Sequence, residues 1–191
     1  QNQPVLLLPS PPPATHNYYK LAKPTKRQYG TGLGNLGNTC FMNSTMQCLA
    51  HTEPLQRYFL TGEYRRDLNR HNPLGTGGEL ATQFAKLLAE MWAGTSGVVY
   101  PRDFKYVLGK HAEQFMGYEQ HDSQELATYL LDALHEDCNR VTHKPYVEKP
   151  EQGATETDEE AADKAWNLHL RRDDSRVLEN FMGQVKSRVQ C

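Results

Sequence analysis

"GNLGNTCFMNSTMQCL", residues 34–49, changes character at its middle and governs the interpretation of the chain around it. The first half is rich in Gly and Asn, which interrupt regular structure, whereas the second half is apolar and compatible with a helix. Cys40 lies at the join, where the helix is predicted to start. Unsatisfied backbone N–H groups and the positive end of the helix dipole meet at such a start, and both favour a thiolate.

The residues before this cysteine suit a nucleophile. Gly34 and Gly37 let a substrate approach the backbone closely, and Asn38 and Thr39 can cap the first helical turn. Asn35 carries an amide donor that can fold back toward an oxyanion beside the sulfur. A thiolate with preorganised donors is the minimum that acyl transfer requires. From spacing alone the other interpretation stays open, namely a small buried cysteine beside an ordinary Gly-Asn turn.

Helical spacing dominates the chain after Gly30, in residues 77–92, 101–110 and 121–140 as well as in the opening stretch. The apolar residues expected to face a core are Leu80, Phe84, Leu87, Leu88 and Met91 in the first, Phe104, Val107 and Leu108 in the second, and Leu126, Tyr129, Leu130, Ala133 and Leu134 in the third. Asp122 and Glu125 have the spacing of a capping box. We therefore expect a mainly α segment.

The regions that flank and interrupt these helices have a different composition. Residues 1–29 are rich in Pro and polar side chains and are interpreted as a linker, with ordered structure from residue 30 to 191. Residues 147–163 are acidic and poor in apolar side chains, so we expect a flexible insert that merges into a short helix around Trp166. Residues 181–191 end in strand-like alternation. Because one strand is not stable alone, we expect its partners to lie outside this chain and the strand to be frayed or mispaired.

Charge and hydropathy exclude several classes of protein. The formal charge of −2 at pH 7 argues against a basic chain that seeks nucleic acid, and no apolar run approaches the roughly 20 residues of a membrane span. The segment "PVLLLPSPPP" has too short an apolar core for a signal peptide. Without a secretion signal, the four cysteines are best interpreted as reduced thiols. We expect a soluble protein of the cytoplasm, the nucleus or both, with no nucleic-acid or membrane partner.

Two long blocks in this order resemble a known family. "GLGNLGNTCFMNSTMQCL" (32–49) closely resembles the cysteine box of the ubiquitin-specific proteases, which are papain-like deubiquitinases. "GYEQHDSQELATYLLDALHEDCNR" (117–140) resembles their Gln-Asp box, and the likeness extends over about residues 30–191. "KPYVE" is similar in particular to members with an upstream ubiquitin-like region. The resemblance implies the helical, thumb-like subdomain of a papain-like α+β fold, followed by the start of a zinc-finger sheet.

The resemblance also implies roles for single residues. Cys40 would be the nucleophile that attacks the carbonyl of ubiquitin's C-terminal glycine, and Asn35 would donate to the oxyanion. Gln120, Asp122 and Glu125 would face ubiquitin's basic C-terminal tail, because carboxylates pair with guanidinium groups. For the two acidic residues the alternative role is helix capping, and both roles can hold together. The implied partners are ubiquitin and ubiquitinated proteins.

Other parts of the family pattern are absent from this sequence. None of the eight histidines lies in a Gly- and Tyr-rich block like the one that supplies the family's catalytic base, and the following Asp or Asn is missing too. His121 is in the Gln-Asp box, where it points to substrate contact or packing. Cys191 would be the first ligand of a structural zinc ion that only the full-length domain completes, and catalysis itself needs no cofactor. We therefore expect this polypeptide alone to turn over negligibly.

Two other functions remain as alternatives. The chain could act as a non-catalytic helical module that binds ubiquitin or another partner, although such a role does not require a thiol at a glycine-flanked helix start. It could also come from a papain-like peptidase without ubiquitin specificity, which the Gln-Asp box argues against.

Overall fold

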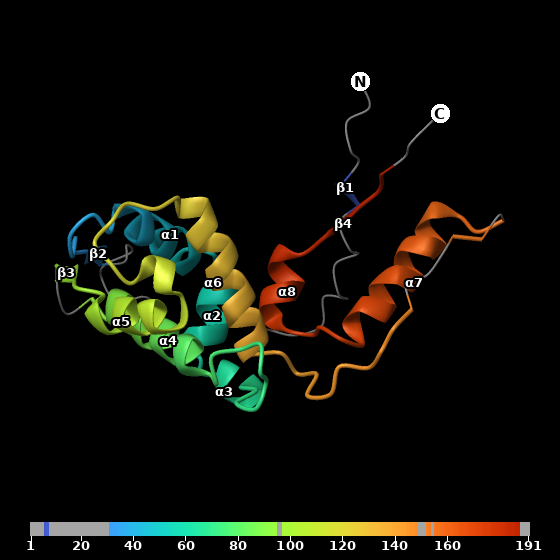
Figure 1. Cartoon of the computed structure of the whole chain (residues 1–191), viewed down its shortest axis with the longest axis horizontal. Coiled ribbons are helices and arrows are strands. Elements are labelled where there is room, and N and C mark those ends of the chain that lie inside the picture. The colour runs from blue at the N-terminus through green and yellow to red at the C-terminus, as the bar shows by residue number, and fades with distance from the viewer. Residues whose placement is uncertain (1–5, 8–30, 95–96, 149–151, 154, 188–191) are drawn as a thin grey trace, which may run out of the picture.

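The computed structural model describes residues 6–7, 31–94, 97–148, 152–153 and 155–187, which are mainly helical (Figure 1). The helices are α1 (Cys40–Ala50), α2 (Glu53–Leu60), α3 (Tyr64–Asp67), α4 (Glu79–Trp92), α5 (Arg102–His111), the 3-10 helix η1 (Glu113–Phe115), α6 (Ser123–Asp137), α7 (Asp158–Leu170) and α8 (Arg176–Phe181). The predicted mainly α class is therefore confirmed. No helix in the described ranges has the length and apolar character needed to cross a membrane.

The strands are short and form two pairs. They are β1 (Leu6–Leu7), β2 (Gly32–Leu33), β3 (Val98–Val99) and β4 (Gln184–Val185). β2 pairs with β3 in parallel, and β4 pairs antiparallel with β1. We expected the partners of the last strand to lie outside the chain. We also expected the strand to be frayed or mispaired without them, and here β4 pairs with Leu6–Leu7 of the predicted linker, because any extended segment presents the same backbone donors and acceptors.

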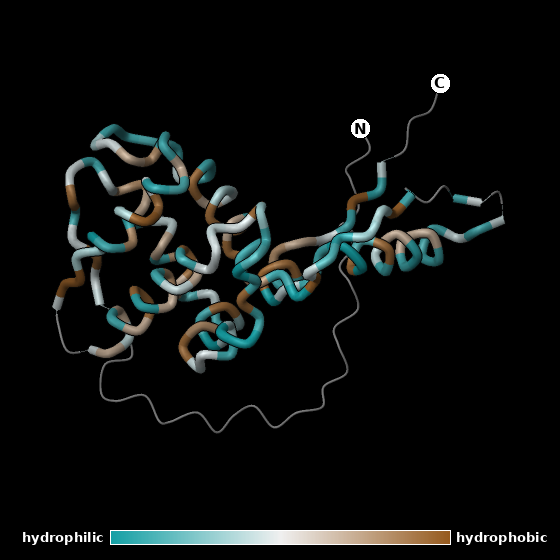
Figure 2. Tube along the Cα trace, turned by 60° about the horizontal axis from the view of Figure 1, so that its bottom comes forward, coloured by the Kyte–Doolittle hydropathy of each residue, from teal (hydrophilic) through white to brown (hydrophobic). Residues whose placement is uncertain are grey.

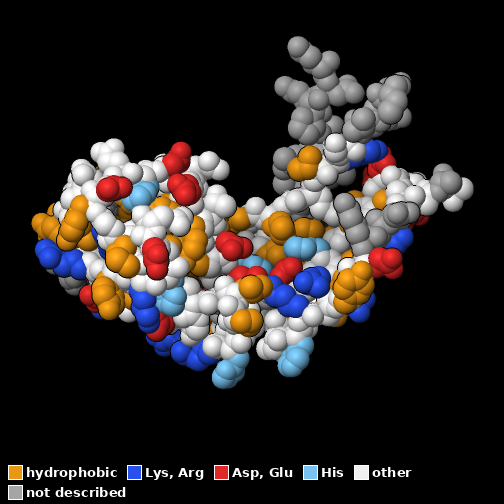
Figure 3. All heavy atoms as spheres, in the orientation of Figure 1, with side chains coloured by type: hydrophobic (Ala, Val, Ile, Leu, Met, Phe, Trp, Pro, Cys, Tyr) orange, Lys and Arg blue, Asp and Glu red, His pale blue; other side chains and the backbone are white. Residues whose placement is uncertain are grey.

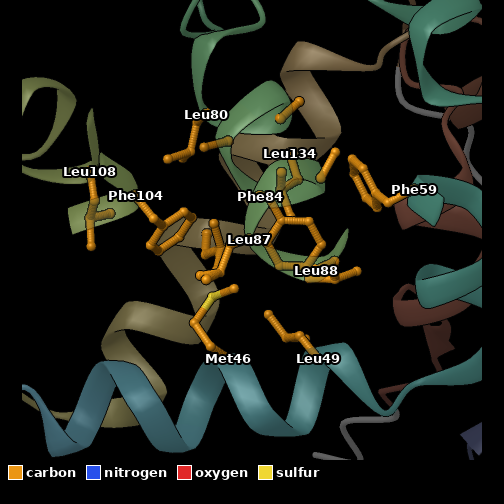
Figure 4. Close-up of a cluster of buried hydrophobic side chains, with 14 of the residues drawn as sticks. Met46, Leu49, Phe59, Leu80, Phe84, Leu87, Leu88, Phe104, Leu108 and Leu134 are labelled. Atoms are coloured by element: carbon orange, nitrogen blue, oxygen red, sulfur yellow. The ribbon is translucent and has the colours of Figure 1, made fainter. Parts of the chain in front are cut away.

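One hydrophobic core holds the helices together, with α4 near its centre (Figure 4). Met46 and Leu49 of α1 point toward Phe84 and Leu87 of α4, and Phe59 of α2 approaches from the side. All the predicted core residues of residues 77–92 and 101–110 are buried. Figure 2 shows that hydrophobic positions recur along each helix of this body, as expected for helices with one buried face.

The N-terminus of α4 is capped by a residue of α6. The N-cap position is Gly78, which has φ 83° and no side chain to accept from the first turn. The buried carboxylate of Asp137 takes that place: Oδ1 accepts from the backbone N–H of Thr76 (2.6 Å) and of Gly78 (3.1 Å). Oδ2 accepts from the Thr76 hydroxyl (2.6 Å) and from the Ala81 N–H (3.1 Å). The end of α6 is thereby tied to the start of α4.

The acidic stretch contains more helix than its composition predicts. We expected residues 147–163 to be a loop that merges into a short helix around Trp166, but α7 already begins at Asp158. Thr157 and Glu160 form a capping box, in which each side chain accepts from the other residue's backbone N–H. The negative charges of the acidic residues in the first turn also interact favourably with the helix dipole and stabilise the helix. α7 extends away from the body of helices in Figure 1, and none of its residues is fully buried.

An ion-pair network joins the end of α6 to the segment before α8. The Lys144 ammonium lies 2.7 Å from Glu136 Oε1 and 2.8 Å from Asp173 Oδ1. Burial is the largest single influence and by itself would raise the pKa of both carboxyl groups, but the hydrogen bonds and charge of Lys144, together with contacts from Asn72 to Glu136 and from His135 to both, hold each pKa below its ordinary value. His135, Glu136 and Asp173 have ligand-type atoms within 4.8 Å of one another. Because Lys144 already pairs with both carboxylates, the group serves as an internal ion-pair network.

Candidate active site

The turn before Cys40 is organised by the side chain of Asn35. Its Oδ1 accepts from the backbone N–H of Gly37 (2.9 Å), from the Thr39 N–H (3.1 Å) and from the Thr39 hydroxyl (3.1 Å). With three donors fixing the oxygen, the amide orientation is set, and its N–H₂ group lies on the other side of the amide. Among the described residues no acceptor is found for that group, so it is available to an incoming molecule.

The two residues predicted to cap the first turn of α1 do not cap it. Thr39 occupies the N-cap position, but its side chain makes no capping hydrogen bond. Its hydroxyl instead accepts from the Leu36 N–H (3.0 Å), inside the turn. Asn38, with φ 51°, donates from Nδ2 to the backbone carbonyl of Tyr118 (2.9 Å). The prediction was wrong because both side chains stabilise the turn itself, which leaves the start of the helix without a side-chain cap.

Cys40 is the first residue of α1 and is exposed. Cys48 is exposed as well, but it lies near the other end of α1. Cys138 is buried, and this burial raises the pKa of its thiol to about 12. Of these three thiols, only Cys40 combines exposure with a helix N-terminus. The alternative of a buried structural cysteine is thereby excluded for Cys40.

The start of α1 lies beside the start of α6. The Thr45 hydroxyl donates to the backbone carbonyl of Ser123 (3.1 Å). The ring of Phe41 packs edge-on against the ring of His121, with 5.1 Å between centroids. Cys40 and Asp122 are the direct chain neighbours of these two rings, so the predicted nucleophile and the predicted acidic contact lie at the same end of the helix pair.

His121 serves packing, one of the two roles predicted for it. Its ring packs against both Phe41 and Phe115, with 5.2 Å between its centroid and that of Phe115, and these two rings also contact each other. Its Nε2 is buried and has no hydrogen-bond partner among the described residues. No hydrogen bond in the described part of the chain joins a histidine to Cys40. The ring therefore supports the start of α1 and offers no proton-accepting contact to the thiol.

The capping box predicted at the start of α6 is not formed, although Asp122 does cap the helix through the N–H of its second residue. Asp122 is the N-cap, and its Oδ1 accepts from the Gln124 N–H (2.6 Å). The reciprocal bond from Glu125 is not made; its Oε1 accepts from the Gln114 amide (3.4 Å) instead. Asp122, Glu125 and the nearby Gln120 are all exposed. Both acidic residues therefore keep carboxylate oxygens available to a partner.

Asn43, Tyr100 and Lys105, none of which was predicted as a site residue, hold the turn and the segments around it. Asn43 Nδ2 donates to the backbone carbonyl of Gly34 (3.2 Å), which holds α1 against the segment after β2. A Cβ atom on Gly34 would lie 2.4 Å from the ring of Tyr100, so only glycine fits there. The Lys105 ammonium donates to the carbonyls of Phe115 (2.9 Å) and of residue 117 (2.7 Å), and burial lowers its pKa. The contact between Gly34 and Tyr100 joins residues far apart in sequence, and no local pattern reveals it.

The expected zinc ligand cannot be placed. Cys191 lies outside the described residues. A structural zinc site needs four ligands, and this sequence supplies one cysteine at the expected position. The zinc site therefore remains a prediction for a longer chain.

Comparison with known proteins identifies the family. The family model described as "Ubiquitin carboxyl-terminal hydrolase" matches residues 31–191, and the chain belongs to this family. The resemblance inferred from the two boxes is thus confirmed.

Its relatives in this family are much longer proteins. The chain is 52% identical over 169 residues to putative ubiquitin carboxyl-terminal hydrolase 11 of Arabidopsis thaliana, covering 88% of this chain and 19% of that protein. It is 51% identical over 160 residues to ubiquitin carboxyl-terminal hydrolase 4 of Mus musculus, covering 84% of this chain and 16% of that protein. A solved structure of the SAGA Ubp8/Sgf11/Sus1/Sgf73 DUB module bound to ubiquitin aldehyde matches 56% of this chain and 24% of that one, with 24% identity and a TM-score of 0.44. The chain thus spans less than a fifth of these curated relatives.

Proposed function

We propose that this chain carries the nucleophile of a thiol-dependent deubiquitinase, which cleaves isopeptide or peptide bonds at the C-terminal glycine of ubiquitin. The observation that carries the proposal is an exposed cysteine at an uncapped helix start, beside an amide donor whose orientation is fixed. These are a nucleophile and an oxyanion donor, the two elements that acyl transfer needs first. Family membership supports the choice of ubiquitin as the substrate.

The chemistry follows from these positions. The Cys40 thiolate attacks the glycine carbonyl carbon, a C–S bond forms, and the carbonyl electrons move to the oxygen. The Asn35 amide and the free N–H groups of the first helical turn stabilise that oxyanion. The C–N bond then breaks, the amine leaves with a proton, and water hydrolyses the thioester to release ubiquitin. The base that carries the proton would come from outside this chain, so the chain alone should turn over very slowly.

The exposed carboxylates at the start of α6 supply binding. Asp122 and Glu125 would pair with the arginines of ubiquitin's C-terminal tail, and Gln120 would add an amide contact. Ubiquitin and ubiquitinated proteins are therefore the proposed partners. Free thiols fit a reducing compartment, so we place the protein in the cytoplasm, the nucleus or both.

A ubiquitin with an electrophile at its C-terminus tests the proposal directly. We expect a covalent adduct with the wild-type chain, none with Cys40→Ala, and an adduct with the matched control Cys48→Ala, because both thiols are exposed but only one lies at the helix start. Intact-protein mass spectrometry measures the adduct. An adduct that persists in Cys40→Ala would overturn the assignment, and reversible ubiquitin binding without any adduct would favour the non-catalytic binding module.

A further inference from the structure

A groove opens beside the turn that carries Asn35. It has a volume of about 680 Å³, within the range of ligand-binding pockets. It is lined by Asn35 and Leu36 and by Arg102, Lys105 and Lys110 of α5. The groove therefore brings the predicted oxyanion donor and the basic residues of α5 to one surface.

The charge that lines this groove is entirely positive. Its described lining includes three cations and no Asp or Glu. The Lys110 ammonium lies 2.7 Å from the Glu79 carboxylate, and the Lys105 ammonium donates hydrogen bonds to backbone carbonyls. Arg102 is the most available cation: its guanidinium lies 5.7 Å from the centre of the Tyr100 ring, and no ion pair to it is found within the described ranges. An anionic occupant is therefore favoured, with Arg102 as its main contact.

Large apolar side chains complete the groove. Met116, Tyr118 and Tyr106 line it while 62%, 72% and 75% exposed, respectively. Figure 3 shows hydrophobic and basic side chains interspersed over the α5 end of the molecule. Exposed apolar clusters next to charged groups are typical of protein interaction sites, where aromatic residues and Arg are enriched. The groove thus fits a peptide segment that carries both acidic and apolar side chains.

We propose that this α5 groove binds an acidic segment of the protein from which ubiquitin is removed, on the leaving-group side of the scissile bond. The inference rests on the proposed deubiquitinase function. Ubiquitin's basic tail is repelled by Arg102 and Lys105 and attracted by Asp122 and Glu125. Because the tail is assigned to the acidic start of α6, the groove lined by Asn35 and α5 remains for the other half of the conjugate.

The acidic stretch of this chain itself is a poor occupant. Its described part opens α7, which lies at the opposite end of the molecule from α5 (Figure 1). Asp158 in that stretch is also paired with Lys186. The acidic stretch of this chain is therefore not the proposed occupant.

Two measurements on the full 191-residue chain test the inference. The first is fluorescence anisotropy with a labelled peptide in which Glu and Asp alternate with Leu and Phe, against its Gln and Asn counterpart. We expect the wild type to prefer the acidic peptide and Arg102→Glu to bind it about tenfold more weakly. The matched control Arg66→Glu reverses another exposed arginine, on α3, and should leave binding unchanged. Equal affinity for both peptides, or an equal loss of affinity in both variants, overturns the proposal that this groove binds an acidic segment.

The second measurement places the groove on the leaving-group side. Ubiquitin is joined through an electrophilic linker to the acidic or to the neutral peptide, and the rate of Cys40 adduct formation is compared within each protein. We expect the acidic conjugate to react about tenfold faster in the wild type and in Arg66→Glu, and this ratio to fall to about one in Arg102→Glu. Equal rates for both conjugates in the wild type overturn the placement.

The outcomes separate this inference from the proposed function. Adduct formation without peptide preference overturns the groove and leaves the deubiquitinase assignment standing. Peptide binding without any adduct overturns the assignment and, with it, the leaving-group placement. A single-stranded oligonucleotide that displaces the peptide at a lower concentration than unlabelled peptide would assign the groove to nucleic acid and overturn the proposal.

Discussion

Replacing Asp137 with Asn tests whether the capping of α4 by α6 stabilises the fold. In the variant, one side-chain atom stays an oxygen and can keep the two N–H groups that Oδ1 now receives, from Thr76 and Gly78. The other becomes an NH₂ group that faces the N–H of Ala81, so two donors meet. The Thr76 hydroxyl can turn and accept instead.

The expected cost follows from these contacts. Leaving the Ala81 N–H unsatisfied in a buried place costs about 1–3 kcal/mol. Removing the negative charge from the helix N-terminus costs about a further 0.5–1 kcal/mol. We therefore expect Asp137→Asn to lower the free energy of unfolding by about 3 kcal/mol, a large part of the 5–15 kcal/mol typical of a domain. Asp137→Ala, which loses all four hydrogen bonds, should cost more.

Urea denaturation at pH 7, followed by circular dichroism, measures the change. Asp132→Asn is the matched control, because Asp132 is an exposed residue of the same helix, and it should change stability by less than about 0.5 kcal/mol. A loss below about 1 kcal/mol in Asp137→Asn, at an unchanged slope with urea, would refute the reasoning.

Three further predictions follow from single contacts. Lys144→Met removes the charge that helps keep the pKa values of Glu136 and Asp173 low despite burial. A lowered folded-state pKa gives stability that is full above the unfolded pKa of about 4 and lost as the pH falls through the folded value, so the stability deficit of the variant should be largest at pH 7 and smaller at acidic pH. Urea denaturation at pH 7 and at an acidic pH measures the deficit, and a deficit that grows in acid would contradict this. The Cys138 thiol, whose pKa burial raises to about 12, should react with iodoacetamide at pH 8 only after unfolding, while Cys48 reacts at once; peptide mass mapping decides, and equal rates would be evidence against its burial. Gly109→Ala places a Cβ 2.9 Å from the Met116 Cα and should cost about 1–3 kcal/mol in thermal unfolding, whereas Gly97→Ala, with open space around it, should cost less; equal losses would rule out the clash.

The body of helices could be predicted from the sequence because its apolar residues recur at helical spacing. Leu80, Phe84, Leu88 and Leu108 are all buried, as that spacing indicates. The start of α7 was missed because an acidic, apolar-poor stretch resembles a loop in composition. The signal that could have found it is the Thr157–Glu160 capping box, which depends on two residues only.

The helix start at Cys40 was predictable from the sequence, whereas the contacts around it were less so. Cys40 at the start of a helix is confirmed, because the Gly-Asn turn and the apolar stretch after it are local features. The contact of Asn38 with the Tyr118 carbonyl joins residues 80 positions apart, and no local pattern encodes it. The cap that Asp137 gives to α4 likewise spans 56 positions to Ala81. Such contacts depend on how the helices pack together.

The placement of α7 outside the core affects how readily this helix unfolds locally. An isolated helix of its 13 residues is only marginally stable in water, and this one has no fully buried side chain to add tertiary support. Its amide protons should therefore exchange with solvent through local fraying, whereas those of α4 should exchange only on global unfolding. The chain would then contain two cooperative units, and binding of a partner along α7 could order one of them without disturbing the other.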